Sequence, residues 1–160
     1  GGIQILFNKP FKSGDYVEIG DVQGKVREIR FMFTTLVTND NKLVVVPNQN
    51  ITTSTLINYT ARDKIRLDLT YSISYDDDIE KAKKVLKQVA ESEPLLLKDP
   101  KYTIGVSKHG ASGVDIVCFV WCKSENYWQA YFSMQEKVKL AFDKNGIHIP
   151  YDQLDVHITK

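Results

Sequence analysis

The chain has 160 residues, of which 42% are apolar and 26% charged, a composition typical of a folded soluble protein and not of a disordered tail. Its formal net charge of +1 is far from the strong positive charge of a nucleic-acid-binding or polybasic membrane-surface protein. No apolar run approaches the roughly 20 residues of a membrane-spanning helix, so we expect that the chain does not cross a bilayer.

The first part of the chain consists of short strand-like runs separated by turn residues, as in an all-β domain. Strands are predicted over 16–19, 25–33, 34–38 and 43–46, with one more within 51–60. The turn before Leu43 contains Asn39, Asp40 and Asn41, and asparagine tolerates the left-handed conformation that a tight turn requires. Short strands joined by tight turns predict a small barrel or sandwich.

The stretch LVVVPNQNI, residues 43–51, changes abruptly from apolar to polar. Pro47 has no N–H to donate to a sheet ladder, so it ends the strand or lies at the edge of the sheet. The pattern therefore predicts a stiff strand that ends in a rigid polar corner.

The second part alternates strands with helices. A polar linker over 60–64 leads into IRLDLTYSISY, whose perfect alternation predicts a half-buried strand. Asp77 and Glu80 resemble a capping box, which predicts a helix from there to about Ser92. Further elements are predicted as strands over 102–107 and 114–122, a helix from Asn126 to about Gly146, and a short strand within 154–160. The order β-α-β-β-α-β resembles a ferredoxin-like fold.

Two groups of side chains in this part have a structural and a functional interpretation. The strand over 114–122 is apolar on both faces and should be central, which would place Cys118 and Cys122 about 13 Å apart, too far for a disulfide. We expect reduced, buried cysteines, and a C-x-x-x-C metal site is the weaker alternative. Helical spacing predicts core positions, rather than a binding stripe, for Tyr127, Trp128, Tyr131 and Phe132.

Catalytic signatures are missing. His109, His148 and His157 have no metal-ligand spacing, and neither a nucleophile elbow nor a glycine-rich phosphate loop occurs. The carboxylates of 76–78 are explained more simply by a helix N-terminus than by a bound cation. We therefore expect no catalytic residues, no cofactor, no metal and no enzyme activity.

Three stretches occur in a specific order: NKPFKSGDYVEIGDVQGKVREI, TTLVTNDNKLVVVPNQNI and LINYT. This combination resembles the cytoplasmic part, or cage, of MscS-like small-conductance mechanosensitive channels, and the resemblance continues through YSISYDDDIEKAKKVL and NGIHIPYDQLDVHI. The residues that match the family pattern in the β domain are Pro10, Phe11, Gly14, Asp15, Gly24, Pro47, Asn48 and Asn58.

The resemblance implies a domain plan. Residues 1–9 would be the stub of a pore-lining helix or a cloning remnant, 10–61 a small Sm-like β domain, and 62–150 a ferredoxin-like α/β domain. Residues 151–160 would supply a strand to a small parallel barrel between subunits, with Asp155, Val156, His157 and Ile158 on the symmetry axis. A frayed terminus or an edge strand of the chain's own sheet is the alternative for this end.

The resemblance also implies a function. The chain would form the vestibule of a homoheptameric channel on the cytoplasmic side of an inner membrane, joined to transmembrane helices outside these residues, and would pass ions and small solutes during osmotic downshock. Side openings would lie near Arg62, Asp63 and Lys64. The polar corner would turn residues 48–51 toward a neighbouring subunit, or else mark an ordinary edge-strand stop.

An RNA-binding module made of the same two folds is the alternative function, because both folds host RNA binders. Nucleic acid is not the expected partner, given the charge. Binding to phosphates weakens steeply with salt, so a titration against single-stranded RNA at two salt concentrations separates the two hypotheses.

Overall fold

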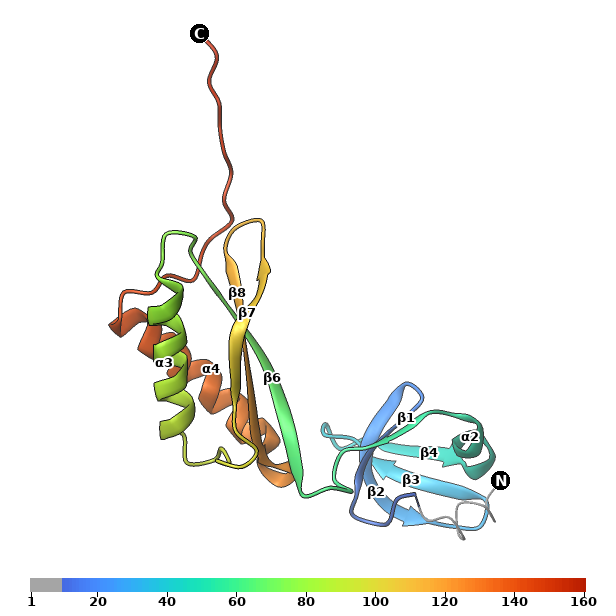
Figure 1. Cartoon of the computed structure of the whole chain (residues 1–160). Coiled ribbons are helices and arrows are strands. Elements are labelled where there is room, and N and C mark those ends of the chain that lie inside the picture. Colours follow the sequence, from blue (N-terminus) through green and yellow to red (C-terminus); the bar gives the residue numbers. More distant parts are fainter. Residues whose placement is uncertain (1–9) are drawn as a thin grey trace. The chain divides into compact units, whose positions relative to one another are not determined.

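The chain divides into two compact units, Gly1–Asp63 and Lys64–Lys160, each with its own hydrophobic core (Figure 1). The computed structural model describes residues 10–160, so the predicted helix stub over 1–9 lies outside the described residues. The two units are taken in turn below.

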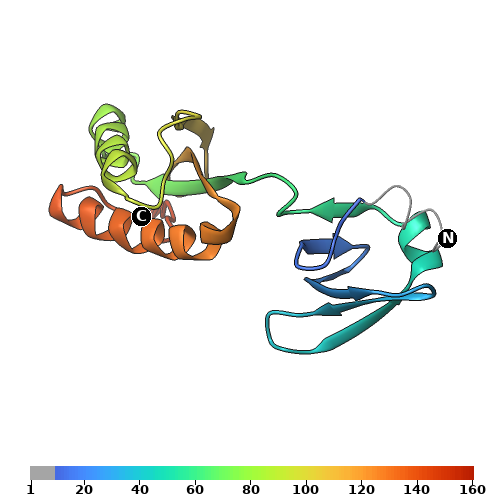
Figure 2. The ribbon, with the colours of Figure 1, turned by 90° about the horizontal axis from the view of Figure 1, so that it is seen from below.

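The first unit is an antiparallel five-stranded sheet with the strand order β4-β3-β2-β1-β5. Its strands are β1 (Tyr16–Ile19), β2 (Val22–Ile29), β3 (Phe33–Val37), β4 (Leu43–Pro47) and β5 (Leu56–Asn58). A short helix, α2 (Asn48–Thr53), joins β4 to β5 and lies at one end of the sheet (Figure 2). The core of this unit is formed by Phe11, Val17, Ile19, Val26, Leu36, Val46 and Ile51.

Three details of the sheet bear on the sequence predictions. The predicted strand over 25–33 was wrong as a single element, because the chain turns at 30–32, with the amide of Arg30 bound to the carbonyl of Phe33 at 2.8 Å. The turn before β4 has Asn41 at φ 65°, which confirms the left-handed asparagine. Gly24 lies so close to β3 that a Cβ there would be 2.9 Å from the carbonyl oxygen of Val37.

The second unit is a three-stranded antiparallel sheet with two helices on one face (Figure 1). Its elements are β6 (Lys64–Ile73), α3 (Ile79–Ser92), β7 (Thr103–His109), β8 (Val114–Lys123), the 3₁₀ turn η1 (Ser124–Asn126) and α4 (Tyr127–Lys144). The strand order β6-β8-β7 confirms that the strand with two apolar faces is central. Alternate residues of β6 and β8 pack against α3 and α4, while the other face of the sheet is not covered by these helices.

The helix ends explain one wrong prediction and one correct one. The N-cap of α3 is Asp78, whose carboxylate accepts hydrogen bonds from the amides of Glu80 and Lys81, so the capping box predicted at Asp77 is off by one residue. The second helix follows Asn126 as predicted, although no side chain caps it. Asp77 has other partners, which are described below.

The core predictions for the second unit are partly right. Cys118 and Cys122 are free and buried, which confirms the expectation of reduced cysteines. Tyr127 and Tyr131 are half-buried, but Trp128 and Phe132 are 52% and 63% exposed, so their assignment to the core was wrong. All four residues lie on α4, as the spacing predicted, but the described residues leave Trp128 and Phe132 exposed.

The last residues form no regular element. Gly146, at φ 68°, follows the end of α4, and Ile147 is buried in the core of the second unit. Residues 151–160 are all exposed and form no strand in this chain, so the short strand predicted within 154–160 is not part of the chain's own sheet. Figure 1 shows this stretch extending beyond the hairpin of β7 and β8.

Candidate functional site

A polar network at the end of β5 joins residues that are far apart in the sequence. The carboxylate of Asp15 accepts hydrogen bonds from the amide of Lys12 at 2.9 Å, from Asn58 Nδ2 at 3.0 Å and from the Thr60 hydroxyl at 3.3 Å. Asn58 Nδ2 also donates to the carbonyl oxygen of Pro10 at 3.2 Å. The network therefore connects the segment that enters the β sheet with the segment that leaves it.

Asp15 is nearly buried, with 7% of its surface exposed. Burial raises the pKa of its carboxyl, but the hydrogen bonds from Asn58, Lys12 and Thr60 outweigh burial and hold the pKa below its ordinary value. Asp15 is consequently a fixed anion that positions backbone, and its oxygens are already engaged by donors within this unit.

A second network fills the corner after β4. Asn48 is 1% exposed, and its side-chain oxygen accepts a hydrogen bond from the Thr34 hydroxyl at 2.7 Å. Its amide group donates to the carbonyl oxygens of Arg30 at 2.7 Å and Phe31 at 3.0 Å. One buried side chain thus provides hydrogen-bond partners for two carbonyls of the turn between β2 and β3 and for one hydroxyl of β3.

The polar corner serves its own unit in part. Asn48 and Ile51 are buried in this unit and only Gln49 and Asn50 of this stretch are exposed, so a contact of residues 48–51 with a neighbouring subunit stays a prediction for these two side chains. What the corner holds in place is the turn over 30–33, whose Phe31, Met32 and Phe33 are 64%, 61% and 47% exposed. This exposed apolar tip was missed, because the residues read as the end of a strand.

The remaining family-motif residues of the β unit have structural positions. Phe11 is part of the core and Pro10 is exposed. Gly14, at φ 95°, adopts a conformation that favours glycine, and its amide binds the carbonyl of Val26 at 2.8 Å. Pro47 pairs with Phe33 as the last residue of β4.

The predicted portal residues lie together at the sequence junction of the two units. Arg62, Asp63 and Lys64 are all exposed. The ammonium of Lys64 reaches the carbonyl of Asp99 at 3.4 Å within the second unit.

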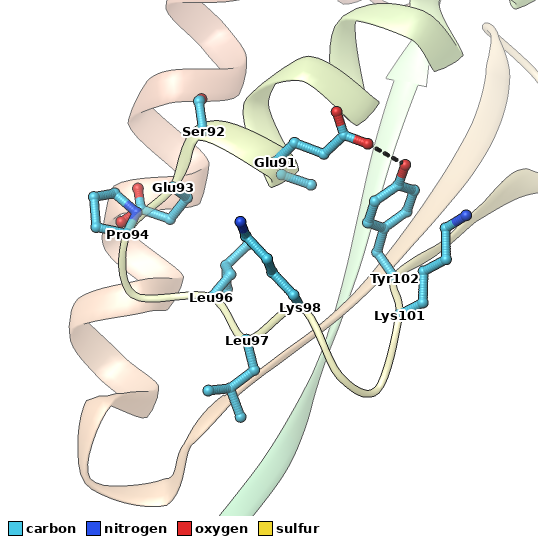
Figure 3. Close-up of a pocket in the computed structure, with 10 residues that line it drawn as sticks. Glu91, Ser92, Glu93, Pro94, Leu96, Leu97, Lys98, Lys101 and Tyr102 are labelled. Carbon is cyan, nitrogen blue, oxygen red and sulfur yellow. Dashed lines mark hydrogen bonds between the residues drawn. The ribbon is translucent and has the colours of Figure 1, made fainter.

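A cavity of about 490 Å³ opens at the end of α3, under the loop that leads to β7 (Figure 3). Figure 3 shows the hydroxyl of Tyr102 pointing to the carboxylate of Glu91, to which it donates at 2.8 Å. Lys98 and Lys101 also line the cavity. No motif in the sequence indicates this cavity.

The carboxylate of Glu93, beside this cavity, faces α4. Its side chain is only 2% exposed, and it accepts hydrogen bonds from Lys137 Nζ at 2.6 Å and from the Ser133 hydroxyl at 2.5 Å. Burial raises the pKa of Glu93, but these bonds and one from the amide of Leu95 outweigh burial and lower the pKa below its ordinary value. This ion pair, of which only the Glu93 side chain is buried, ties the loop after α3 to α4.

Two apolar surfaces of the second unit are exposed among the described residues 10–160. On α4, the rings of Trp128 and Phe132 are stacked with centroids 5.8 Å apart and lie exposed. In the terminal segment, Val156 and Ile158 are 70% and 88% exposed, and Asp155 and His157 beside them are exposed as well. The axial-barrel candidates therefore bind no other element of the described chain.

No helix among residues 10–160 combines the length and the apolar character needed to cross a membrane. In the same residues, no three His, Cys, Asp or Glu side chains gather closely enough to hold a metal ion.

Two family models match the chain, one after the other. Residues 1–61 match the model described as "Mechanosensitive ion channel, beta-domain", and residues 67–149 match "Mechanosensitive ion channel MscS, C-terminal". The chain belongs to the MscS family of mechanosensitive ion channels. This confirms the resemblance inferred from the sequence, and, because the family consists of channels, it also confirms that the chain is not an enzyme.

Individual relatives agree with the family models. A small-conductance mechanosensitive channel of Edwardsiella ictaluri is 39% identical over 157 residues, which make up 98% of this chain and 55% of that protein. The crystal structure of Helicobacter pylori MscS in the closed state has a TM-score of 0.94 at 32% identity, over 99% of this chain and 63% of that one. Arabidopsis thaliana MSL1, with a TM-score of 0.76 at 18% identity over 95% of this chain and 57% of that one, shares the fold.

The chain thus spans just over half the length of the first curated MscS relatives that it matches, for example 55% of the Edwardsiella protein. Within that span its fold is an antiparallel β unit followed by an α+β unit, in the order of the MscS β domain and C-terminal domain.

Proposed function

We propose that this chain forms the cytoplasmic vestibule of an MscS-like channel that releases ions and small solutes on osmotic downshock. The observation that carries the proposal is the match to H. pylori MscS over 99% of this chain with a TM-score of 0.94. In this proposal the pore-lining helices lie outside the 160 residues, and the chain lies on the cytoplasmic side of the membrane that holds them.

The finer fold assignment belongs to the same proposal. The β unit is Sm-like and the second unit ferredoxin-like, with three strands in the order β6-β8-β7 and one helix after each of β6 and β8. Seven copies form the vestibule. The apolar tip over 31–33 and the terminal segment support this assembly, because both expose apolar side chains that a neighbouring copy can cover.

Two functional surfaces follow from the assembly. Arg62, Asp63 and Lys64, which are exposed, lie at side openings through which solutes enter. Asp155, Val156, His157 and Ile158 contribute one strand per copy to a parallel barrel on the symmetry axis. Barrel closure would pair the backbone groups of this segment, which forms no strand in the single chain.

A chimeric channel tests the proposed function. This chain replaces the matching segment of the E. ictaluri channel, and the chimera is expressed in cells that lack their own mechanosensitive channels. We expect survival of osmotic downshock and tension-activated currents in excised patches. A chimera that reaches the membrane as a folded oligomer but passes no current under tension would contradict the proposal.

Deletion of residues 155–160 tests the barrel separately. We expect the heptamer to dissociate at higher concentration than the unaltered chain does, because each copy loses its axial strand, while each subunit stays folded. Light scattering measures the assembly and thermal unfolding measures the subunit. Unchanged assembly together with a lower unfolding temperature would show that the segment serves its own unit instead.

The RNA-binding alternative is not supported by any feature of the structure. Both matched family models describe channel domains.

A further inference from the structure

The path of the chain after α4 is fixed by contacts between segments that lie far apart in the sequence. Gly146 turns the chain, and Ile147 is 4% exposed with its amide bound to the carbonyl of Phe142 at 2.9 Å. From Ile147 onward no helix or strand holds the backbone. Other contacts must therefore set the direction in which the terminal segment leaves.

Asp77 supplies the first of these contacts, across 71 residues of sequence. Its Oδ2 accepts hydrogen bonds from the backbone amide of His148 at 2.7 Å and from that of Ser74 at 3.2 Å. Its Oδ1 lies 3.0 Å from His148 Nδ1. The amide of Ser74 also binds the carbonyl of His148 at 2.9 Å, so Ser74, Asp77 and His148 form a closed set, which we call the Asp77 clamp.

The two halves of the clamp differ in exposure. The Asp77 side chain is 9% exposed, whereas that of His148 is 75% exposed. The Asp77 carboxylate thus belongs to the loop between β6 and α3. Through His148 it holds the chain that follows α4. A charged acceptor makes a stronger hydrogen bond to an amide than a neutral one does, which suits an attachment point.

The tip of the β7–β8 hairpin supplies the second set of contacts. A Cβ on Gly113 would be 2.7 Å from Pro150 Cγ, so Pro150 rests directly on this glycine. The Ser112 hydroxyl then accepts a hydrogen bond from the amide of Gln153 at 3.1 Å. Beyond Gln153, residues 154–160 make no hydrogen bond to another described element.

We propose that the Asp77 clamp, together with the hairpin tip, positions residues 151–160 so that the terminal segments of neighbouring copies converge for assembly. The inference rests on the proposed function, because it takes the terminal segments to meet in a shared barrel. A segment whose direction is already set loses less freedom when it pairs, so assembly is more favourable with the clamp than without it. Asp77 is a positioning residue in this account and takes no part in conduction.

The test compares Asp77→Asn with Asp76→Asn. Both variants remove one negative charge from neighbouring positions, but Asp76 is exposed and its side chain takes no part in the clamp. Asparagine keeps the shape of aspartate but carries no charge and has one acceptor oxygen instead of two, so its bonds to the amides of Ser74 and His148 are weaker and its NH2 group cannot accept from the imidazole. Any difference between the two variants therefore reports the clamp and not the charge.

The readout is the direction of the terminal segment in the full chain. Spin labels are placed on cysteines introduced as Lys84→Cys, on the exposed side of α3, and Val156→Cys, and labelled chains are diluted with unlabelled ones so that distances within one chain are measured. We expect Asp77→Asn to widen the distance distribution at least twofold and Asp76→Asn to leave it unchanged. An unchanged distribution in Asp77→Asn, or equal widening in both variants, overturns the clamp.

A second variant covers the case in which Asp77→Asn does not fold. His148→Ala changes an exposed side chain, keeps the backbone bonds of the clamp and removes only the imidazole contact. We expect a smaller widening of the distribution and unchanged tryptophan fluorescence. An unchanged distance distribution in His148→Ala would overturn the contribution of the imidazole. If Asp77→Asn does not fold, the same result would overturn the clamp.

Light scattering on unlabelled chains that carry only Asp77→Asn or Asp76→Asn separates the clamp from the barrel. A wider distribution with weaker assembly supports both. A wider distribution with unchanged assembly supports the clamp as the device that sets the direction, overturns its role in assembly, and counts against the barrel. An unchanged distribution overturns the clamp whatever the assembly does.

Discussion

At the scale of single residues, polar side chains buried in the β unit hold backbone in place. Asn48 is the clearest case, because its oxygen accepts from Thr34 of β3 and its amide group donates to two carbonyls of the turn between β2 and β3. The neighbouring Pro47 ends β4, and Asn48 N then binds the carbonyl of Met32 at 2.9 Å. Through these bonds Asn48 holds the exposed apolar tip over 31–33 in place.

We predict that Asn48→Ala loosens this tip. The substitution leaves the Thr34 hydroxyl and two carbonyls without their partner, and an unsatisfied buried polar group costs about 1–3 kcal/mol. Hydrogen exchange of the amides in β3 and β4 measures the loss. Asn50→Ala, at an exposed position of the same short helix, is the control, and equal effects of the two changes would contradict the assignment.

The acid sensitivity of the second unit is predicted to depend on Glu93. The pKa of Glu93 is lowered in the folded chain, so its contribution to the free energy of unfolding is fully present above the ordinary glutamate pKa and is lost as the pH falls through the lowered value. We expect Glu93→Gln to flatten the fall of stability in acid. Both tryptophans, Trp121 and Trp128, lie in this unit, so tryptophan fluorescence follows its unfolding selectively.

Lys137→Gln is the informative companion to that variant. It leaves the Glu93 carboxylate buried without its cation, so we expect a larger loss of stability at neutral pH than Glu93→Gln causes. If Glu93→Gln retains the acid dependence of the unaltered chain, the lowered pKa of Glu93 is not its source.

At the scale of the elements, the approach of β2 to β3 leaves no room for a side chain at Gly24. We predict that Gly24→Ala destabilises the β unit by about 1–3 kcal/mol, because the new methyl group meets backbone that cannot move aside easily. Gly105→Ala in β7 is the matched control, since a Cβ there meets nothing within 4 Å. Calorimetry of the two variants gives the comparison, and similar transition temperatures would refute the steric argument.

The elements also show what the sequence could predict. Alternation placed β6 correctly, because burial of one face repeats every second residue, and two apolar faces correctly marked β8 as the central strand. The helix α2 could not be read from Asn48–Thr53, since it has no side-chain cap and only six residues. The terminal segment alternates as strands do, but a strand needs a partner, and alternation does not say whether the chain supplies one.

Contacts between distant residues were beyond sequence reasoning. The family motif named Asp15 and Asn58 without giving a reason for pairing them, and the structure shows a hydrogen bond of 3.0 Å across 43 residues. The Asp77 clamp and the Glu93–Lys137 pair gave no sequence signal, because each joins two ordinary surface residue types. Trp128 and Phe132 were misplaced for a related reason, since an apolar helix face does not reveal what covers it.

At the scale of the whole molecule, the two units have separate cores and are joined by a short exposed stretch. We predict that reversing the charges at this stretch, as Arg62→Glu with Lys64→Glu, changes the ion preference of the chimeric channel, because the change is repeated in every subunit around the side openings. The reversal potential under a salt gradient measures the preference. Lys81→Glu with Lys84→Glu, on exposed positions of α3, is the control, and a shift of equal size in both would remove the case for portals at 62–64.

The buried cysteines have a practical consequence for reagent chemistry. Cys118 and Cys122 are both 0% exposed, and burial raises the pKa of the Cys118 thiol to about 12 and that of Cys122 above its ordinary value. Maleimides and methanethiosulfonates are electrophiles that react with the nucleophilic thiolate, which neither residue presents to solvent in the folded chain. A cysteine introduced at the surface can therefore be modified selectively with both native thiols left in place, and delayed modification of those two thiols reports opening of the second unit's core.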